Sequence, residues 1–277
     1  MRVIPVVELE QTVARLCLEA CCSLPEDVVA ALEQAKAQES GHGAAVLTQI
    51  LENQRLASAA HRPCCQDTGL AVVFLDIGQD VYLDGDVNAA VTQGVKTAYT
   101  QGYLRKSSLT ALSRENTGDN TPPILHLRFV PGDRVSVTVA PKGFGSENMS
   151  RLYMLKPAQG REGVLDAIVE TARLGAPNAC PPVILGVGIG GTMEAAALLA
   201  KRQLLRTLGQ PSGDEEIASL EQEALTRINA LGVGPMGLGG KITALAVHAA
   251  QIPTHLAGLP VAINVQCHCA RHAQATL

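Results

Sequence analysis

Residues 178–196, NACPPVILGVGIGGTMEAA, contain a short apolar run, then a cluster of glycines, then residues that favour a helix. The run over 183–187 is rich in Val, Ile and Leu and lies between a proline pair and glycines, which predicts a buried strand. The segment 192–207 predicts the helix that follows. A buried strand that leads directly into a helix indicates an α/β fold.

The rest of the chain extends this pattern outward from the same stretch. Its N-terminal third has helical periodicity, and strands and helices alternate after it. We therefore expect one α/β domain over residues 1–277, which can form two lobes: a helical N-terminal part followed by a mixed β-sheet with flanking helices. Further helices are predicted over 8–22, 25–39, 43–60, 86–103, 160–174 and 214–230, and further strands over 71–77, 124–130, 134–140, 242–249 and 260–266.

Residues 124–140 predict a β-hairpin. Pro131 and Gly132 occupy the two central positions that a type II turn favours. After the turn, Val135, Val137 and Val139 alternate with polar residues, so the three valines should share one buried face.

Composition and charge exclude several classes of function. The net charge is −4 with both signs interspersed, and no basic stripe of the kind that binds nucleic acid is present. No apolar run approaches the roughly 20 residues of a membrane-spanning helix. The N-terminus carries acidic residues where a signal peptide would not, so we expect a cytoplasmic protein without membrane or nucleic-acid partners.

Because the chain shows no secretion signal, we expect its eight cysteines to be free thiols or metal ligands and not disulfides. Cys17, Cys21 and Cys22 lie in an apolar helical pattern, where cysteine behaves as a small hydrophobic residue. Cys64 and Cys65 are adjacent, and adjacent side chains point in different directions, so one should serve a site while the other packs.

The glycine cluster GVGIGG admits two interpretations. Through Gly186, Gly188 and Gly191 it matches the G-x-G-x-x-G pattern of dinucleotide sites. That pattern also needs an acidic residue at the end of a second strand about 20 residues later, and here the loop TLGQPSGDEE follows instead. The alternatives are a helix N-terminus that suits an anionic carboxylate, or glycines that let a helix pack closely.

Structural zinc sites bring their ligands in local pairs, and the spacings in this chain do not match them. What remains is one cysteine from each of three polar loops, namely Cys65, Cys180 and Cys267. Three thiolates can hold three irons of a cubane cluster and leave the fourth iron open as a Lewis acid.

Five motifs then identify a resemblance that covers essentially the whole chain. The chain resembles the α-type region of class I (iron–sulfur) fumarate hydratases, and it is similar to the related tartrate dehydratase α subunits through CQDTG and NACPP. The C-terminal segment is closer to the fumarases. The motifs are CQDTG, KGFGSENMS, NACPPVILGVGIGGTMEAAALLAK, GLGGKITALAV and PTHLAGLPVAINVQCH.

The resemblance implies a 4Fe-4S cluster held by Cys65, Cys180 and Cys267. It makes Cys64 the packing residue of its pair. Cys269 departs from the family pattern as an additional thiol near the site, which leaves the choice between Cys267 and Cys269 open. The resemblance also implies substrate contacts at Gln66, Asp67, Arg105, Gly145 and His255, of which Asp67 and His255 could form a pair that protonates the departing hydroxide.

The function that these features predict is the reversible dehydration of malate to fumarate. Because a dicarboxylate substrate needs at least two cationic groups and the resemblance supplies Arg105 with Lys241 as a less certain second, we expect a separately encoded β-type subunit that completes the site. The resemblance implies an α2β2 assembly. Tartrate dehydratase α remains the enzymatic alternative, and a non-catalytic metal-binding module is the alternative from another class.

Overall fold

The computed structural model describes all of residues 1–277, which form two compact units. Unit 1 comprises residues 1–25, 53–143 and 271–277, and unit 2 comprises residues 26–52 and 144–270. The polypeptide therefore crosses between the units four times. None of its helices combines the length and the apolar character that crossing a membrane requires.

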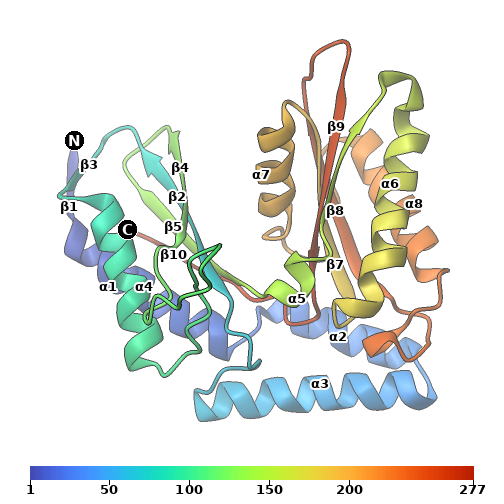
Figure 1. The fold of residues 1–277 in the computed structure, drawn as a ribbon, viewed down its shortest axis with the longest axis horizontal. Coiled ribbons are helices and arrows are strands. Elements are labelled where there is room, and N and C mark those ends of the chain that lie inside the picture. The colour runs from blue at the N-terminus through green and yellow to red at the C-terminus, as the bar shows by residue number, and fades with distance from the viewer. The chain divides into compact units, whose positions relative to one another are not determined.

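Unit 1 is built on a mixed four-stranded sheet in the order β10-β5-β2-β4 (Figure 1). Helices α1 and α4 pack on it, and Leu16, Tyr99 and Val137 are among the fully buried side chains between them. A separate pair of short parallel strands, β1 and β3, completes the unit. The elements are β1 (Arg2–Pro5), α1 (Val6–Cys22), β2 (Leu70–Gly78), β3 (Val81–Asp84), α4 (Val87–Gln101), β4 (Ile124–Val130), β5 (Val135–Lys142) and β10 (Ala273–Thr276).

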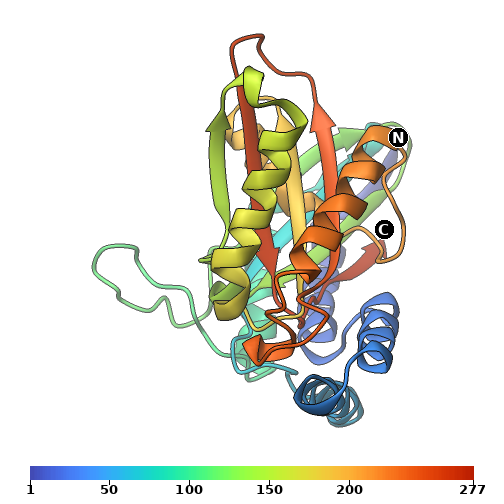
Figure 2. The same ribbon diagram turned by 90° about the vertical axis from the view of Figure 1, so that its right-hand side faces the viewer.

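Unit 2 has three layers around the mixed sheet β6-β9-β7-β8, with α7 on one face and α6 and α8 on the other (Figures 1 and 2). Its remaining helices are short or peripheral, except that α3 begins in unit 2 and ends in unit 1. The elements are α2 (Glu26–Gln38), α3 (Gly41–Ala60), α5 (Phe144–Glu147), β6 (Arg151–Leu155), the 3-10 turn η1 (Pro157–Gln159), α6 (Gly160–Gly175), η2 (Ala176–Asn178), β7 (Val183–Gly190), α7 (Met193–Gln203), α8 (Glu215–Asn229), η3 (Pro235–Gly237), β8 (Ala244–Ile252) and β9 (Leu259–Gln266).

The fold class is confirmed, since the chain is a mixed α/β protein with N-terminal helices. Every predicted helix and strand is present, and no boundary differs by more than four residues. The sequence missed β1, β3, β6, β10 and α5, which are only four or five residues long and too short to show a periodic pattern. It placed the start of the second helix at Pro25, whereas α2 begins at Glu26.

The hairpin predicted over residues 124–140 is wrong in its pairing. β4 and β5 are joined by a tight turn with Gly132 at φ +103°, but β2 lies between them, parallel to β4 and antiparallel to β5. The turn bonds to the end of β2 instead, because the Gly78 amide donates to the Arg134 carbonyl at 2.8 Å and the Gln79 amide donates to the Val130 carbonyl at 2.9 Å. The predicted buried face of Val135, Val137 and Val139 is confirmed.

The glycines of β7 allow close packing of a helix on a strand. A Cβ atom on Gly186 would lie 2.2 Å from the Ala200 carbonyl oxygen, and one on Gly188 would lie 2.1 Å from the Ala196 carbonyl oxygen. Both glycines lie inside the fully buried strand, whereas the glycines of a dinucleotide fingerprint form the turn after it. The packing interpretation of GVGIGG is therefore the one that the structure confirms.

Candidate active site

The segment that carries Cys65, Gln66 and Asp67 is a loop that leads into β2 of unit 1. Oδ1 of Asp67 accepts a hydrogen bond from the Gly69 amide at 2.9 Å, which closes a local turn. Gly69 has φ +74°, and a Cβ atom there would lie 2.7 Å from the backbone of Lys142. Only glycine therefore fits this position, where the loop approaches the backbone of β5 closely.

Three buried side chains from distant parts of unit 1 hold this loop. The hydroxyl of Tyr99 donates to the carbonyl oxygens of Thr68 (2.8 Å) and Gly69 (3.1 Å), and Nδ2 of Asn120 donates to the same Gly69 oxygen (3.1 Å). Nη2 of Arg271 donates to the carbonyl oxygen of Asp67. The sequence analysis missed all three of these side chains. What they share is that each is a polar residue with only 0–5% exposure, which becomes visible only in the structure.

The two adjacent cysteines of this loop have different surroundings. The Cys64 amide donates to the Cys21 carbonyl at 3.0 Å, and its carbonyl accepts from Nδ2 of Asn53 at 2.8 Å. Cys64 is also close enough to help raise the pKa of the buried Cys21 and Cys22 thiols, for which burial is the larger cause. Cys64 thus packs against the end of α1, and the Cys65 thiol contacts Oε1 of Gln66 at 3.6 Å.

Arg105 and Gly143 lie beside the same loop. Oγ1 of the buried Thr68 donates to the Arg105 carbonyl at 3.0 Å. A Cβ atom on Gly143 would lie 3.2 Å from Oδ2 of Asp67. Unit 1 therefore brings together Cys65, Gln66, Asp67 and the backbone of Arg105.

In unit 2, Cys180 and Cys267 lie on two loops that a single residue joins. The amide of His268 donates to the Cys180 carbonyl oxygen at 3.3 Å, and its Nδ1 lies 3.0 Å from the same oxygen. Cys180 has φ +51° and is exposed, and Cys267 is half-buried. Cys269 is buried, and its carbonyl accepts from Nε2 of Gln266 at 3.0 Å, so Cys267 is the more accessible thiol of that pair.

Gly145 belongs to this same end of unit 2. It lies in the short helix α5, in which Glu147 accepts a hydrogen bond from Nδ2 of Asn264 at 2.9 Å, three residues before Cys267. Nζ of Lys201 contacts the other oxygen of Glu147 at 2.5 Å. Burial lowers the pKa of Lys201, and the Glu147 carboxylate opposes that effect. Gly145 itself is exposed, with open space around the position of a Cβ atom.

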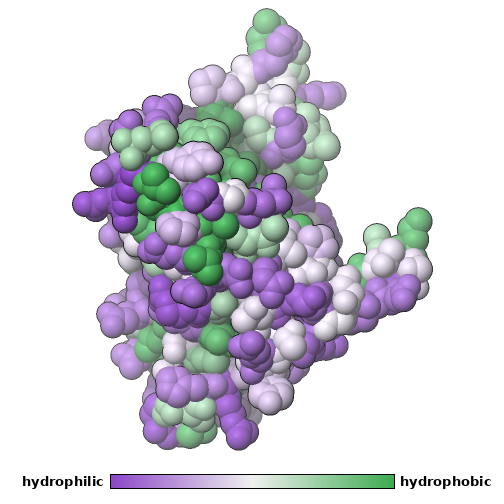
Figure 3. Space-filling model, turned by 90° about the vertical axis from the view of Figure 1, so that its left-hand side faces the viewer, coloured by the Kyte–Doolittle hydropathy of each residue, from purple (hydrophilic) through white to green (hydrophobic).

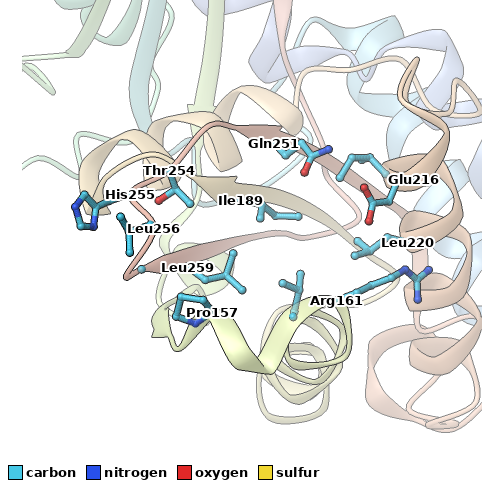
Figure 4. Close-up of a pocket in the computed structure, with 14 residues that line it drawn as sticks. Pro157, Arg161, Ile189, Glu216, Leu220, Gln251, Thr254, His255, Leu256 and Leu259 are labelled. Carbon is cyan, nitrogen blue, oxygen red and sulfur yellow. The ribbon is translucent and has the colours of Figure 1, made fainter.

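His255 lies elsewhere in unit 2, on the loop between β8 and β9. The loop borders a cavity of about 340 Å³ under the ends of α6 and α8, and Figure 4 shows the imidazole at the edge of that cavity, directed away from Arg161 and Glu216. Nδ1 of His255 accepts a hydrogen bond from the Ala257 amide at 3.2 Å. The structure does not bring His255 to the two cysteines of its own unit.

The side chain of Lys241 is exposed, and the hydrogen bond at this residue is made by its backbone amide. Oε1 of Glu39 accepts from the amides of Lys241 and Ile242, both at 2.6 Å.

No three Cys, His, Asp or Glu side chains are grouped in the structure so that they could hold a metal ion. The predicted ligands are divided, with Cys65 in unit 1 and Cys180 and Cys267 in unit 2.

Comparison with known proteins shows which family the chain belongs to. The model of the family described as fumarate hydratase (Fumerase) matches residues 10–276. The chain belongs to the fumarate hydratase family. As a member, it is a hydro-lyase of the α-subunit type, and the loops described above are those of a fumarate hydratase family member.

Several relatives extend over almost the whole chain. A protein of Methanocaldococcus jannaschii, provisionally named L(+)-tartrate dehydratase subunit alpha, is 42% identical over 96% of this chain and 96% of its own length. The L(+)-tartrate dehydratase subunit alpha of Escherichia coli strain UTI89 is 33% identical over 94% of this chain and 88% of its own. The protein of the same name from Shigella sonnei is 32% identical over the same shares.

Proposed function

We propose that this fumarate hydratase family member is the α subunit of an iron–sulfur hydro-lyase that interconverts malate and fumarate. The observation that carries the proposal is that His268 ties the loop of Cys180 to the loop of Cys267, so two thiols from separate motifs share one end of unit 2. Both are accessible, and thiolates are the ligands that iron–sulfur clusters take.

The proposed cluster ligands are Cys65, Cys180 and Cys267. The motifs that carry them, CQDTG, NACPP and VQCH, support this set. When bound, a cluster with one iron open would supply a Lewis acid for the departing hydroxyl.

The remaining residues would hold the substrate and move the proton. Gln66 and the Gly145 loop offer hydrogen bonds, and Arg105 offers a cation for one carboxylate. Asp67 has its carbonyl and Oδ1 fixed by Arg271 and Gly69, so its carboxylate is oriented before substrate binds. His255 would donate the proton to the leaving hydroxide, since imidazole changes charge near neutral pH.

L(+)-tartrate is the second candidate substrate, and the similarity to proteins named tartrate dehydratase subunit alpha favours it. Malate and tartrate differ by one hydroxyl, so a single hydrogen-bonding group can decide between them. The PTHLAGLPVAIN segment, which resembles the fumarases, favours malate.

A β-type subunit is the proposed partner, in an α2β2 assembly within the reducing interior of the cell. A dicarboxylate needs two cationic clamps, and Arg105 is the one assigned in this chain. Three exposed apolar side chains on the edge strand β4 support coverage by another chain, namely Ile124, Leu127 and Phe129, at 47%, 50% and 71% exposure. On the face of the molecule in Figure 3, hydrophobic residues gather among hydrophilic ones.

The test is an anaerobic reconstitution of the α chain with and without its β partner, followed by assays with malate and with L(+)-tartrate. We expect iron in the α chain, turnover only in the presence of β, and a higher kcat/KM for malate. Cys180→Ser and Cys267→Ser should lose iron, whereas Cys269→Ser should keep it. Full iron in Cys180→Ser would refute the proposed ligand set, and a higher kcat/KM for tartrate would reassign the substrate.

A further inference from the structure

Three cysteines without a role in the proposed reaction meet at the end of α1. Cys21 and Cys22 are the last two residues of that helix, and Cys64 lies at the start of the loop that carries the candidate ligand Cys65. The amide of Cys64 donates to the carbonyl oxygen of Cys21 at 3.0 Å. All four residues belong to unit 1, and none of them is in a disulfide. A cysteine of the loop therefore lies against two cysteines of the helix.

The hydrogen bond between Cys64 and Cys21 limits the distance between the backbones of Cys22 and Cys64. The Cys21 carbonyl belongs to the peptide group that leads into Cys22, so standard bond lengths allow at most about 7 Å between the Cα atoms of Cys22 and Cys64. Disulfides join cysteines whose Cα atoms are about 4.4–6.8 Å apart. The backbone therefore needs little or no movement to accommodate a disulfide between these two residues.

The side chains of Cys22 and Cys64 are also neighbours. Burial is the first cause that raises the pKa of the Cys22 thiol, and the charge of Cys64 is the second. A like charge has this effect only when it is close to the titrating group. The effect on the pKa and the limit on the backbone distance together place the two thiols side by side.

Cys21 is the poorer partner for Cys64. The residue is 0% exposed, and its thiol donates to the Thr68 carbonyl at 3.8 Å. Burial raises the pKa of this thiol to about 12, so almost none of it is in the reactive thiolate form at neutral pH. Cys22 is 9% exposed and lies at the very end of the helix, where its side chain can turn toward the loop.

Hydrogen bonds to α3 hold the backbone at both cysteines. Oγ of Ser23, the residue after Cys22, donates to Oγ of Ser58 at 3.0 Å. Nδ2 of Asn53 donates to the Cys64 carbonyl at 2.8 Å. Two thiols that are held together in this way react with each other much faster than with thiols in solution. An oxidised sulfur on one of them should therefore be captured by the other.

We infer that Cys22 and Cys64 form a reversible disulfide when the chain is exposed to a peroxide. The O–O bond of hydrogen peroxide breaks as the Cys64 sulfur takes one oxygen, which gives a sulfenic acid and one water. The Cys22 sulfur then attacks the Cys64 sulfur, the S–O bond breaks, and the oxygen leaves as a second water. In total the two thiols lose two electrons and two protons, and the peroxide takes up both. A dithiol reductant restores the two thiols.

The disulfide protects the loop that carries Cys65. A sulfenic acid that no thiol captures is oxidised further to sulfinic and sulfonic acids, which thiol reductants do not reverse. Cys64 directly precedes Cys65, so such a group would place a permanent negative charge beside a proposed cluster ligand. Capture by Cys22 stops the oxidation at a reversible stage. This protective role rests on the proposed function, whereas the disulfide itself does not.

The test exposes the 277-residue chain, without a cluster, to hydrogen peroxide and maps its disulfides by non-reducing peptide mass spectrometry. We expect a crosslink between the peptides that contain Cys22 and Cys64, and its loss on treatment with dithiothreitol. Cys22→Ser should abolish the crosslink. Cys17→Ser and Cys21→Ser are the matched controls and should retain it, because both residues are fully buried in the same helix.

Three results would overturn the inference. The first is a wild-type chain without the crosslink, and the second is a crosslink to Cys64 that persists in Cys22→Ser. The third is a crosslink that forms only after denaturation in urea, because such a crosslink would not depend on the folded geometry.

A second measurement separates the protective role from the proposed function. After treatment with peroxide and then dithiothreitol, Cys64 should carry more sulfinic acid in Cys22→Ser than in the wild-type chain. On anaerobic reconstitution the wild-type chain should recover the iron content of an untreated sample, and Cys22→Ser should recover less. Equal sulfinic acid in the two proteins would overturn the protective role. An untreated wild-type chain that binds no iron would overturn the proposed function and leave the disulfide standing.

Discussion

The carbonyl oxygen of Cys180 accepts from both the amide and the imidazole of His268, at 3.3 and 3.0 Å. A carbonyl can only accept, so Nδ1 of His268 carries the proton. One residue thus fixes the loop before β7 to the loop after β9 and sets the spacing of Cys180 and Cys267.

His268→Ala should loosen this pair of loops without unfolding unit 2. The backbone bond remains and one side-chain bond, worth about 1 kcal/mol, is lost. We expect iron to be lost from the reconstituted chain about fivefold faster under a chelator, with little change in the unfolding midpoint. His268→Asn, which can still donate from a position close to that of Nδ1, should lose iron more slowly than the alanine variant. Equal rates in all three proteins would remove this role of His268.

Tyr99→Phe should destabilise unit 1 by about 1–3 kcal/mol, because the one hydroxyl proton that the buried carbonyls of Thr68 and Gly69 share is lost. The Asp67 loop should also become more susceptible to protease. Urea unfolding measures the first effect and limited proteolysis the second. The control is Tyr82→Phe, since Tyr82 is 49% exposed and should tolerate the change. A similar loss of stability in the two variants would contradict the anchoring role.

Gly188→Ala tests the close packing of α7 on β7. The added Cβ atom would lie 2.1 Å from the Ala196 carbonyl, so the helix or the strand must shift. Overpacking of this kind costs about 1–3 kcal/mol or more. Gly213→Ala is the matched control, because no atom lies within 4 Å of a Cβ atom there. Thermal unfolding should separate the two variants by several degrees, and an unchanged Gly188→Ala would show that α7 is not held as closely as described.

The elements of this fold were predictable from local pattern, and their pairing was not. The turn at Pro131 and Gly132 is encoded locally, but the insertion of β2 between β4 and β5 depends on residues some 50 positions earlier. The cysteine motifs predicted loops that carry candidate ligands. Sequence could not place Cys180 beside Cys267 or His255 at the far end of β9, because strand length and direction determine both.

The anchors of the Asp67 loop were unpredictable for a related reason. Tyr99 and Asn120 contact Gly69 from 30 and 51 residues away, and Arg271 contacts Asp67 from 204 residues away. No periodic pattern marks a polar residue that is buried to hold a remote loop. Such residues are recognised only when burial and hydrogen bonds are seen together.

His248 should make stability depend on pH below neutrality. Burial first, and the Arg206 guanidinium second, lower its pKa from 6.5 to about 4. The unfolded chain therefore binds a proton that the folded chain does not, so stability falls as pH decreases from about 6.5 to about 4, by up to about 3 kcal/mol. His248→Asn should flatten this dependence, and the exposed His42→Asn should not. Urea unfolding midpoints at pH 7.5, 6, 5 and 4.5 provide the measurement, and parallel curves for wild type and His248→Asn would contradict it.

Alkylation of the cluster-free α chain should separate the packing cysteines from the accessible ones. Burial raises the pKa of Cys21 to about 12 and also raises the pKa of Cys17, and both thiols are inaccessible. Because the thiolate is the reactive form, the Cys21 thiolate population at pH 8 is about a thousandfold below that of a thiol with a pKa of 9. Cys180 is exposed and should react first with iodoacetamide. Peptide mass spectrometry over time should show Cys180 modified early, and Cys17 and Cys21 only after denaturation. Early modification of Cys17 would mean that α1 separates from the sheet of unit 1 in the native state.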